Sequence, residues 1–195
     1  MEQHWKLKDL GQTILFAAIY FVIVLAATIM GGIHPLLYLL VTTLIALLAW
    51  IPYMYVTAKV PKMGVVLIMN LFVVIAFLAF GELANMLLIS LIVCAILAEI
   101  VRRRMGYKNY KGVVMSYILF SLSNIGSPLY VWIFPEYAVS EAVEEMSTTY
   151  AETLSTMTSL WFMILAVVAT FVVSAIAGAL AKKVYSRQLE NAGIM

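Results

Sequence analysis

The chain has few of the residues on which catalysis and metal binding usually depend. Its 195 residues include one cysteine, Cys94, two histidines, His4 and His34, and a single aspartate, Asp9. One cysteine excludes an internal disulfide and a multi-cysteine metal site. The sequence contains neither an HExxH pattern nor the GxxxxGK[ST] loop that cradles nucleotide phosphates. These absences predict a chain that is not an enzyme, carries no metal or cofactor, and does not hydrolyse ATP by that route.

Charge is also scarce, and apolar residues dominate the composition. Charged residues make up 11% of the chain and hydrophobic residues 65%, with a mean hydropathy of +1.03. A soluble domain of this length cannot bury so much apolar surface, whereas a lipid bilayer can solvate it. The net charge of +2 comes from small basic groups between apolar runs, so it does not indicate nucleic-acid binding. The composition predicts a multi-pass membrane protein with the bilayer as its solvent.

Six apolar stretches are candidates for membrane-spanning helices. About 20 apolar residues cross a bilayer as a helix, and about 17 form the lower limit. The candidates cover residues 10–30, 36–55, 64–80, 86–101, 113–134 and 159–181. The third and fourth are short, and their brief connection predicts a tight antiparallel pair. The expected fold is an all-α membrane protein, a bundle of six transmembrane helices in one domain over residues 1–195.

The basic residues predict the orientation of this bundle. All twelve lysines and arginines fall on one side of a six-helix arrangement. Positively charged loops stay in the cytoplasm during insertion. Both termini are therefore expected to be cytoplasmic, and the long loop 135–158 is expected outside.

This outer loop is acidic and longer than the other outer connections. The stretch 134–154 contains five glutamates and no lysine or arginine. An outward position explains the missing positive charges, but it does not explain the length. At helical spacing, one face carries Ser140, Ala142, Val143, Met146, Tyr150 and Leu154, while the glutamates Glu141, Glu144, Glu145 and Glu152 face elsewhere. The pattern predicts a short amphipathic helix over the outer mouth of the bundle. A moving lid and a passive surface loop both remain open.

Candidate ligand-binding residues gather at the expected outer ends of the helices. Asn124, Ser127 and Tyr130 in the fifth stretch are expected to face a cavity under the acidic loop, with Trp132 and Trp161 as walls. The alternatives are that the polar residues hold helices together, that the tryptophans belong to the interfacial aromatic belt, and that the loop histidine is a polar surface residue. The full set of candidates is Gly32, His34, Asn85, Asn124, Ser127, Tyr130, Trp132, Tyr150 and Trp161.

Two further features concern the helices themselves. Gly126 and Pro128 are expected to loosen the outer half of the fifth helix, and the freed backbone groups must find partners. Glu99 precedes Arg103 by four residues near the cytoplasmic end of the fourth helix, a spacing that predicts an ion pair.

Several segments together resemble the Trep_Strep family of bacterial integral membrane proteins. They are KLKDL and FAAIYFV near the start, IPYMYVTAKVPKMG after the second stretch, GYKNYKGVVMSYILFSL into the fifth, and LENAGI at the end. The six-helix pattern with a long outer loop also resembles the substrate-binding S component of an energy-coupling-factor (ECF) transporter.

This resemblance implies a function, a location and a set of partners. An S component in the bacterial cytoplasmic membrane captures a small nutrient outside, such as a vitamin, cofactor or tetrapyrrole. It then docks on a membrane coupling subunit driven by two ATPases. Many S components dock through an AxxxA pattern in the first helix, and the nearest match here is Thr13 to Ala17, followed by Ala18. Metal-binding relatives begin with Met-His, whereas Met1 is followed here by Glu2, which argues against a metal cargo.

Overall fold

In the computed structural model, the backbone is described for residues 4–191 and the side chains for residues 4–182. The Met1 and Glu2 positions and the last residues of the LENAGI motif lie outside the described residues. Ten helices make up the described fold, with no strand among residues 4–191. They are α1 (Leu7–Ile33), α2 (Pro35–Leu39), α3 (Val41–Lys59), α4 (Val65–Phe80), α5 (Asn85–Met105), α6 (Tyr110–Ser121), α7 (Gly126–Ile133), α8 (Pro135–Glu145), α9 (Thr148–Ser155) and α10 (Leu160–Asn191). The predicted all-α class is confirmed for this part of the chain.

Each of the six predicted apolar stretches is helical, although they differ in length. Four helices, α1, α3, α5 and α10, are long and apolar enough to cross a bilayer, and the bent pair α6–α7 makes a fifth candidate. Helix α4 is apolar but has 16 residues. Four or five spans are therefore supported by length and composition, and a sixth through α4 stays a prediction.

The structure corrects three of the predicted boundaries. The second stretch does not run from residue 36 as one helix, because α2 ends at Leu39 and α3 begins at Val41. The fifth is interrupted at residues 122–125, and its halves meet at an angle of 51°. The acidic loop is not one helix, since α8 and α9 are separated by an extended residue, Met146 (φ −119°, ψ −175°). The predicted loosening near Gly126 is confirmed as this break.

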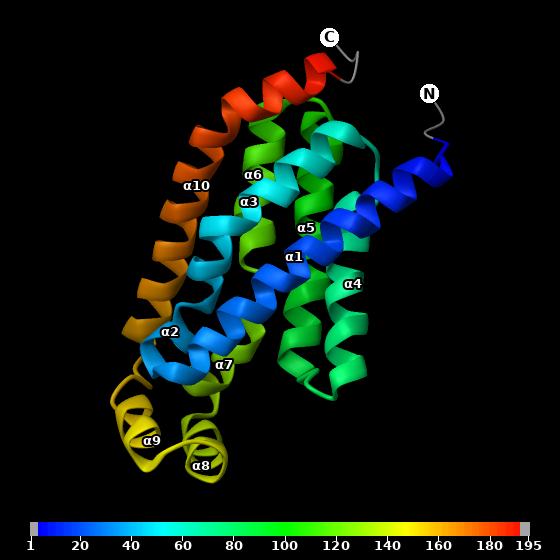
Figure 1. The fold of residues 1–195 in the computed structure, drawn as a ribbon. Helices are drawn as coiled ribbons and strands as arrows, with labels where there is room; N and C mark the ends of the chain where they lie inside the picture. Colours follow the sequence, from blue (N-terminus) through cyan, green and yellow to red (C-terminus); the bar gives the residue numbers. More distant parts are fainter. Residues whose placement is uncertain (1–3, 192–195) are drawn as a thin grey trace.

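The bundle is organised around α3. Of the four long helices, α3 has the largest buried share in its apolar segment. Helices α1 and α10 pack against α3, and α5 packs against α4 and α6 (Figure 1). The predicted antiparallel pair α4–α5 is confirmed, with Gly81 in a left-handed conformation at the turn. The main core contains fully buried Tyr20, Tyr53 and Tyr117 among aliphatic side chains. Much of the apolar surface outside this core stays exposed, as expected for helices that face lipid.

The two ends of the bundle differ in charge. We call one the basic end, because it carries every described lysine and arginine, at the start of α1, the α3–α4 and α5–α6 connections, and α10 (Figure 1). There, Lys62 Nζ lies 2.6 Å from Asp9 Oδ2. Arg102 lies 3.5 Å from Glu99 Oε2, and Glu99 Oε1 accepts a hydrogen bond of 3.0 Å from the Gly64 amide. The predicted Glu99–Arg103 pair is wrong: Arg102, one residue earlier, is the buried neighbour, whereas Arg103 is exposed.

Candidate functional site

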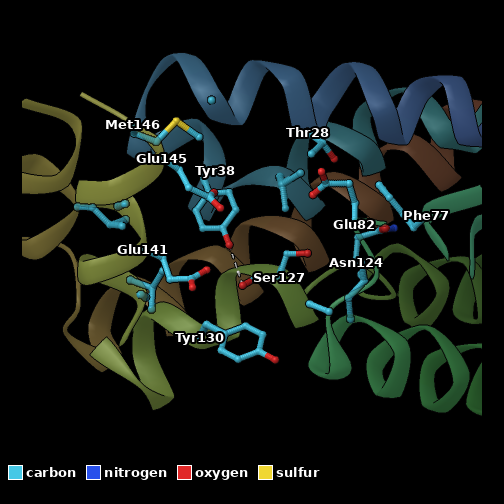
Figure 2. A pocket seen from close by; sticks show the side chains of 18 of the residues that line it. Thr28, Tyr38, Phe77, Glu82, Asn124, Ser127, Tyr130, Glu141, Glu145 and Met146 are labelled. Atoms are coloured by element: carbon cyan, nitrogen blue, oxygen red, sulfur yellow. Dashed lines mark hydrogen bonds between the residues drawn. The ribbon is translucent and has the colours of Figure 1, made fainter. Parts of the chain in front are cut away.

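At the other end, which we call the cavity end, the helices enclose a hollow of about 720 Å³. Its walls come from α1, α2, α3, the α4–α5 turn and α7, and α8 and α9 lie across it (Figure 2). Cavities of this size hold drug-sized molecules in other proteins. The lining combines tyrosines, glutamates, asparagines and aliphatic side chains.

Asn124 is the deeply buried polar side chain of this lining. It is 3% exposed, and its Nδ2 donates a hydrogen bond of 2.9 Å to the hydroxyl of Tyr20. The Oδ1 atom accepts no hydrogen bond from the described residues. Figure 2 shows Asn124 beside Glu82, on the wall opposite α8. This oxygen is not one of the fully enclosed polar atoms that lack a partner. It is therefore accessible from the cavity, where a ligand or water can donate to it.

The break between α6 and α7 places Asn124 on the wall, and neighbouring helices satisfy its backbone. Ser90 Oγ on α5 donates to the Ser123 carbonyl at 2.8 Å and accepts from the Gly126 amide at 3.1 Å. Asn70 on α4 donates to Ser123 Oγ at 2.8 Å. A side chain at Gly126 would overlap the backbone of α5 at Met86. The break is therefore held by α4 and α5 and requires glycine.

Two tyrosines attach the helices at the cavity mouth. The Tyr38 hydroxyl of α2 donates to the Ser127 carbonyl at 2.8 Å, which ties α2 to α7 (Figure 2). The Tyr150 hydroxyl of α9 donates to the Gly31 carbonyl at 2.9 Å, which ties α9 to the end of α1. Burial raises the pKa of the Tyr150 phenol to about 12, so the hydroxyl keeps its proton at neutral pH.

Helix α8 turns two carboxylates toward the cavity. Glu141 and Glu145, one helical turn apart, both line it together with Ala142 (Figure 2). The sequence pattern placed these glutamates off the helix face that carries Ala142, yet Glu141, Ala142 and Glu145 all border the cavity. Hydrogen bonding to Glu141 raises the pKa of the Tyr137 phenol on the same helix. The loop thus contributes charge to the cavity as well as apolar cover.

The charge of this lining has one sign. Glu82, Glu141 and Glu145 line the cavity, and no lysine or arginine does. Among the side chains that the structure describes, no ion pair involves any of these three carboxylates. Within the same residues, no group of three or more His, Cys, Asp or Glu side chains is arranged to hold a metal ion. The cavity therefore offers negative charge without the geometry of a metal site.

The structure brings together six of the nine predicted site residues. On the cavity lining lie Gly32, Asn85, Asn124, Ser127, Tyr130 and Tyr150. His34, Trp132 and Trp161 are not on it. His34 instead caps α2, where its Nδ1 accepts a hydrogen bond of 3.1 Å from the Leu36 amide. Trp132 is buried in a second apolar cluster with Leu39 and Val131, and Trp161 is 76% exposed at the start of α10.

The predicted docking residues on α1 lie mostly inside the bundle. Thr13 and Ala17 are fully buried, and Ala18 is half-buried. Helix α1 turns this face toward α3 and α4. In this arrangement Thr13 and Ala17 present no surface to a partner, because the small side chains serve close helix packing within the chain.

Sequence reasoning missed several residues of the lining. Thr28, Tyr38, Phe77 and Glu82 all contribute to the wall. Glu82 had a readable signal, since it is the one charged residue in a turn at the acidic side of the chain. The others lie in apolar stretches, where the sequence does not reveal which helix face will meet a hollow.

Comparisons with known proteins give one match. The family model described as "Hypothetical bacterial integral membrane protein (Trep_Strep)" matches residues 7–191. No curated protein and no solved structure matches the chain.

Proposed function

Because the chain belongs to the Trep_Strep family of hypothetical bacterial integral membrane proteins, we propose that it is the substrate-binding membrane subunit of an ECF-type nutrient importer. The cavity of about 720 Å³ carries this proposal. A purely structural or assembly protein gains nothing from such a hollow, whereas a cleft of this volume with polar groups on its wall is typical of ligand sites. A hollow with a buried polar wall supports ligand capture instead.

The proposed topology has six spans in the bacterial cytoplasmic membrane with both termini inside. The clustering of lysine and arginine at the basic end supports this orientation. Helix α4 would then cross with 16 residues, a length that requires local thinning of the bilayer. In this orientation the cavity opens to the outside, where a scarce nutrient must be captured.

The proposed partners supply the energy that the chain lacks. A membrane coupling subunit and two ATPases would move the captured small molecule inward, since the sequence has no phosphate-binding loop of its own. Helices α8 and α9 would act as a lid. Helix α9 is joined to α1 by the Tyr150–Gly31 hydrogen bond, and Ala142, Ala151 and Leu154 pack in an apolar cluster with Leu39, Val131 and Trp132. Contacts of this kind can open and close.

A pull-down of the tagged protein from its native membranes in mild detergent tests this function. Mass spectrometry should find a coupling membrane protein, two ATPases and a bound small molecule. A variant with Asn124→Ala and Tyr130→Ala should keep the protein partners and lose the small molecule. Trp161→Ala, which alters an exposed side chain off the cavity, should keep both. Recovery of the wild-type protein alone, without ATPases or ligand, would favour a structural role.

A further inference from the structure

The cavity has a charge and hydrogen-bonding character that points to one class of ligand. We infer that it selects a small organic cation, an amine or a related nitrogen base joined to an apolar or aromatic body. This inference rests on the proposed function and names its substrate class. It follows from three features of the lining. These are its carboxylates, the unpartnered oxygen of the Asn124 side chain, and hydroxyls that already donate within the protein.

The first argument is the balance of charge. Three carboxylates, from Glu82, Glu141 and Glu145, line the hollow without an ion-pair partner among the described side chains. Figure 2 shows Glu82 near Asn124 on one side, and Glu141 and Glu145 on α8 on the other. A ligand carboxylate or phosphate would meet only repulsion here. All three side chains are exposed to solvent, so salt screens part of this charge, and a cation that lies between them still gains attraction.

The second argument concerns the hydrogen-bonding groups of the lining, several of whose donors bond within the protein. The hydroxyls of Tyr38 and Tyr150 donate to backbone carbonyls, and the Thr28 hydroxyl donates to Val24 within α1. The Asn124 amide group donates to Tyr20. Donors of Asn85, Ser127 and Tyr130 also lie on the lining, but strong acceptors prevail there: three carboxylates and Asn124 Oδ1, on a side chain that is 3% exposed. A ligand that complements them must bring N–H donors, which ammonium and amidine groups do.

The third argument concerns the rest of the ligand. Tyr130 and Tyr137 lie on the cavity lining with their rings tilted to each other and the ring centroids 5.9 Å apart. Tyrosine faces attract organic cations and accommodate flat apolar bodies. A bare metal ion does not fit, because no cluster of three ligating side chains exists among the described residues. A volume of about 720 Å³ exceeds what a single ammonium ion fills.

A matched pair of probes tests this inference directly. Tryptamine and indole-3-propionate have nearly the same shape and opposite charge at pH 7. Isothermal titration of the purified full-length protein in detergent, at physiological salt, should show tryptamine binding at least about tenfold more tightly than indole-3-propionate. Equal affinities, tighter binding of the anion, or no binding of tryptamine at millimolar concentration would each overturn the inference.

Paired variants of α8 locate the effect. Glu141→Gln with Glu145→Gln should weaken tryptamine binding about tenfold, because it removes two carboxylates from the cavity while preserving shape. Glu136→Gln with Glu144→Gln removes the same charge from exposed positions of the same helix that do not line the cavity. This control should retain affinity within about twofold, since Glu136 and Glu144 do not border the cavity and salt screens charges that lie farther from the ligand. Equal losses in the two doubles would show a general surface-charge effect and contradict the site.

The titration and the pull-down fail independently. If ATPases co-purify but tryptamine does not bind, the importer function stands and the cationic class is wrong. If tryptamine binds selectively but no ATPase or coupling subunit is recovered, the class stands and the importer function is wrong.

Discussion

The basic end and the cavity end handle their charges in opposite ways. At the basic end, acids and bases meet in pairs, Asp9 with Lys62 and Glu99 with Arg102. At the cavity end, three carboxylates surround a hollow with no positive partner among the described residues. Paired charges hold elements together, whereas solvated carboxylates without a partner stay available to a ligand. We therefore expect substitutions at the basic end to lower stability, and substitutions of the carboxylates at the cavity end to change binding with little effect on stability.

The largest effect is expected at Arg102, which is fully buried beside Glu99. Arg102→Met keeps an apolar stem but leaves a buried carboxylate without its partner, so the free energy of unfolding should fall by about 3–5 kcal/mol. Thermal unfolding in detergent measures this loss. Arg103→Met, at an exposed position, controls for the loss of positive charge. Unfolding at the wild-type temperature would show that the pair does not stabilise the basic end.

A smaller loss is expected at Gly126, where α7 meets α5. Gly126→Ala places a methyl group against the backbone of Met86, so α7 must shift and stability should fall by about 1–3 kcal/mol. The shift should also weaken tryptamine binding, because Asn124 and Ser127 flank this position on the cavity wall. Gly11→Ala, in open space, is the matched control. Unchanged stability and binding would contradict the close approach of the two helices.

Tyr150→Phe should have a local effect of about 1 kcal/mol, because it removes one hydrogen bond, to the Gly31 carbonyl. The expected result is faster amide hydrogen exchange in α8 and α9 with little change in the rest of the bundle. Ser155→Ala serves as the comparison, since the Ser155 hydroxyl bonds within α9 itself. Uniform acceleration across the bundle would mean that α9 is part of the core and not a separable lid.

The smallest effect on stability is expected for the pair Glu141→Gln and Glu145→Gln. Like charges four residues apart destabilise a helix by about 0.2–0.5 kcal/mol, so neutralising both should leave the unfolding temperature unchanged or slightly raised. The same measurement on Glu136→Gln with Glu144→Gln, which are not spaced in this way, provides the reference. A loss above about 1 kcal/mol would assign these carboxylates a structural role and would remove the contrast between the two ends.

Much of the fold follows from patterns that the sequence displays openly. Runs of apolar residues predicted every long helix, and the short link after Phe80 predicted the antiparallel pair α4–α5. The break in the fifth helix was signalled by Gly126 and Pro128. Its position at residues 122–125 was not readable, because it depends on hydrogen bonds from Ser90 and Asn70 on other helices. Local signals identify a weak point, and tertiary partners decide where it opens.

The candidate site was less predictable than the fold. Polar residues in an apolar helix, such as Asn124, stand out in the sequence. The direction of α8 does not, because helical periodicity separates two faces without saying which one a hollow will occupy. Glu141 and Glu145 were therefore assigned to the wrong surroundings. The tryptophans gave the weakest guide. Trp132 is packed in an apolar cluster and Trp161 is on the exposed surface, and the residue type does not distinguish these places.

The hydrogen bonds that hold the α6–α7 break also impose an order on biosynthesis. Ser90 satisfies the interrupted backbone at Ser123 and Gly126, and Asn70 donates to the Ser123 hydroxyl. Both residues precede that segment in the chain. A ribosome makes the amino-terminal part first, so α4 and α5 are already synthesised when the fifth apolar stretch emerges. The interrupted backbone can therefore form its hydrogen bonds with α4 and α5 as soon as it enters the membrane.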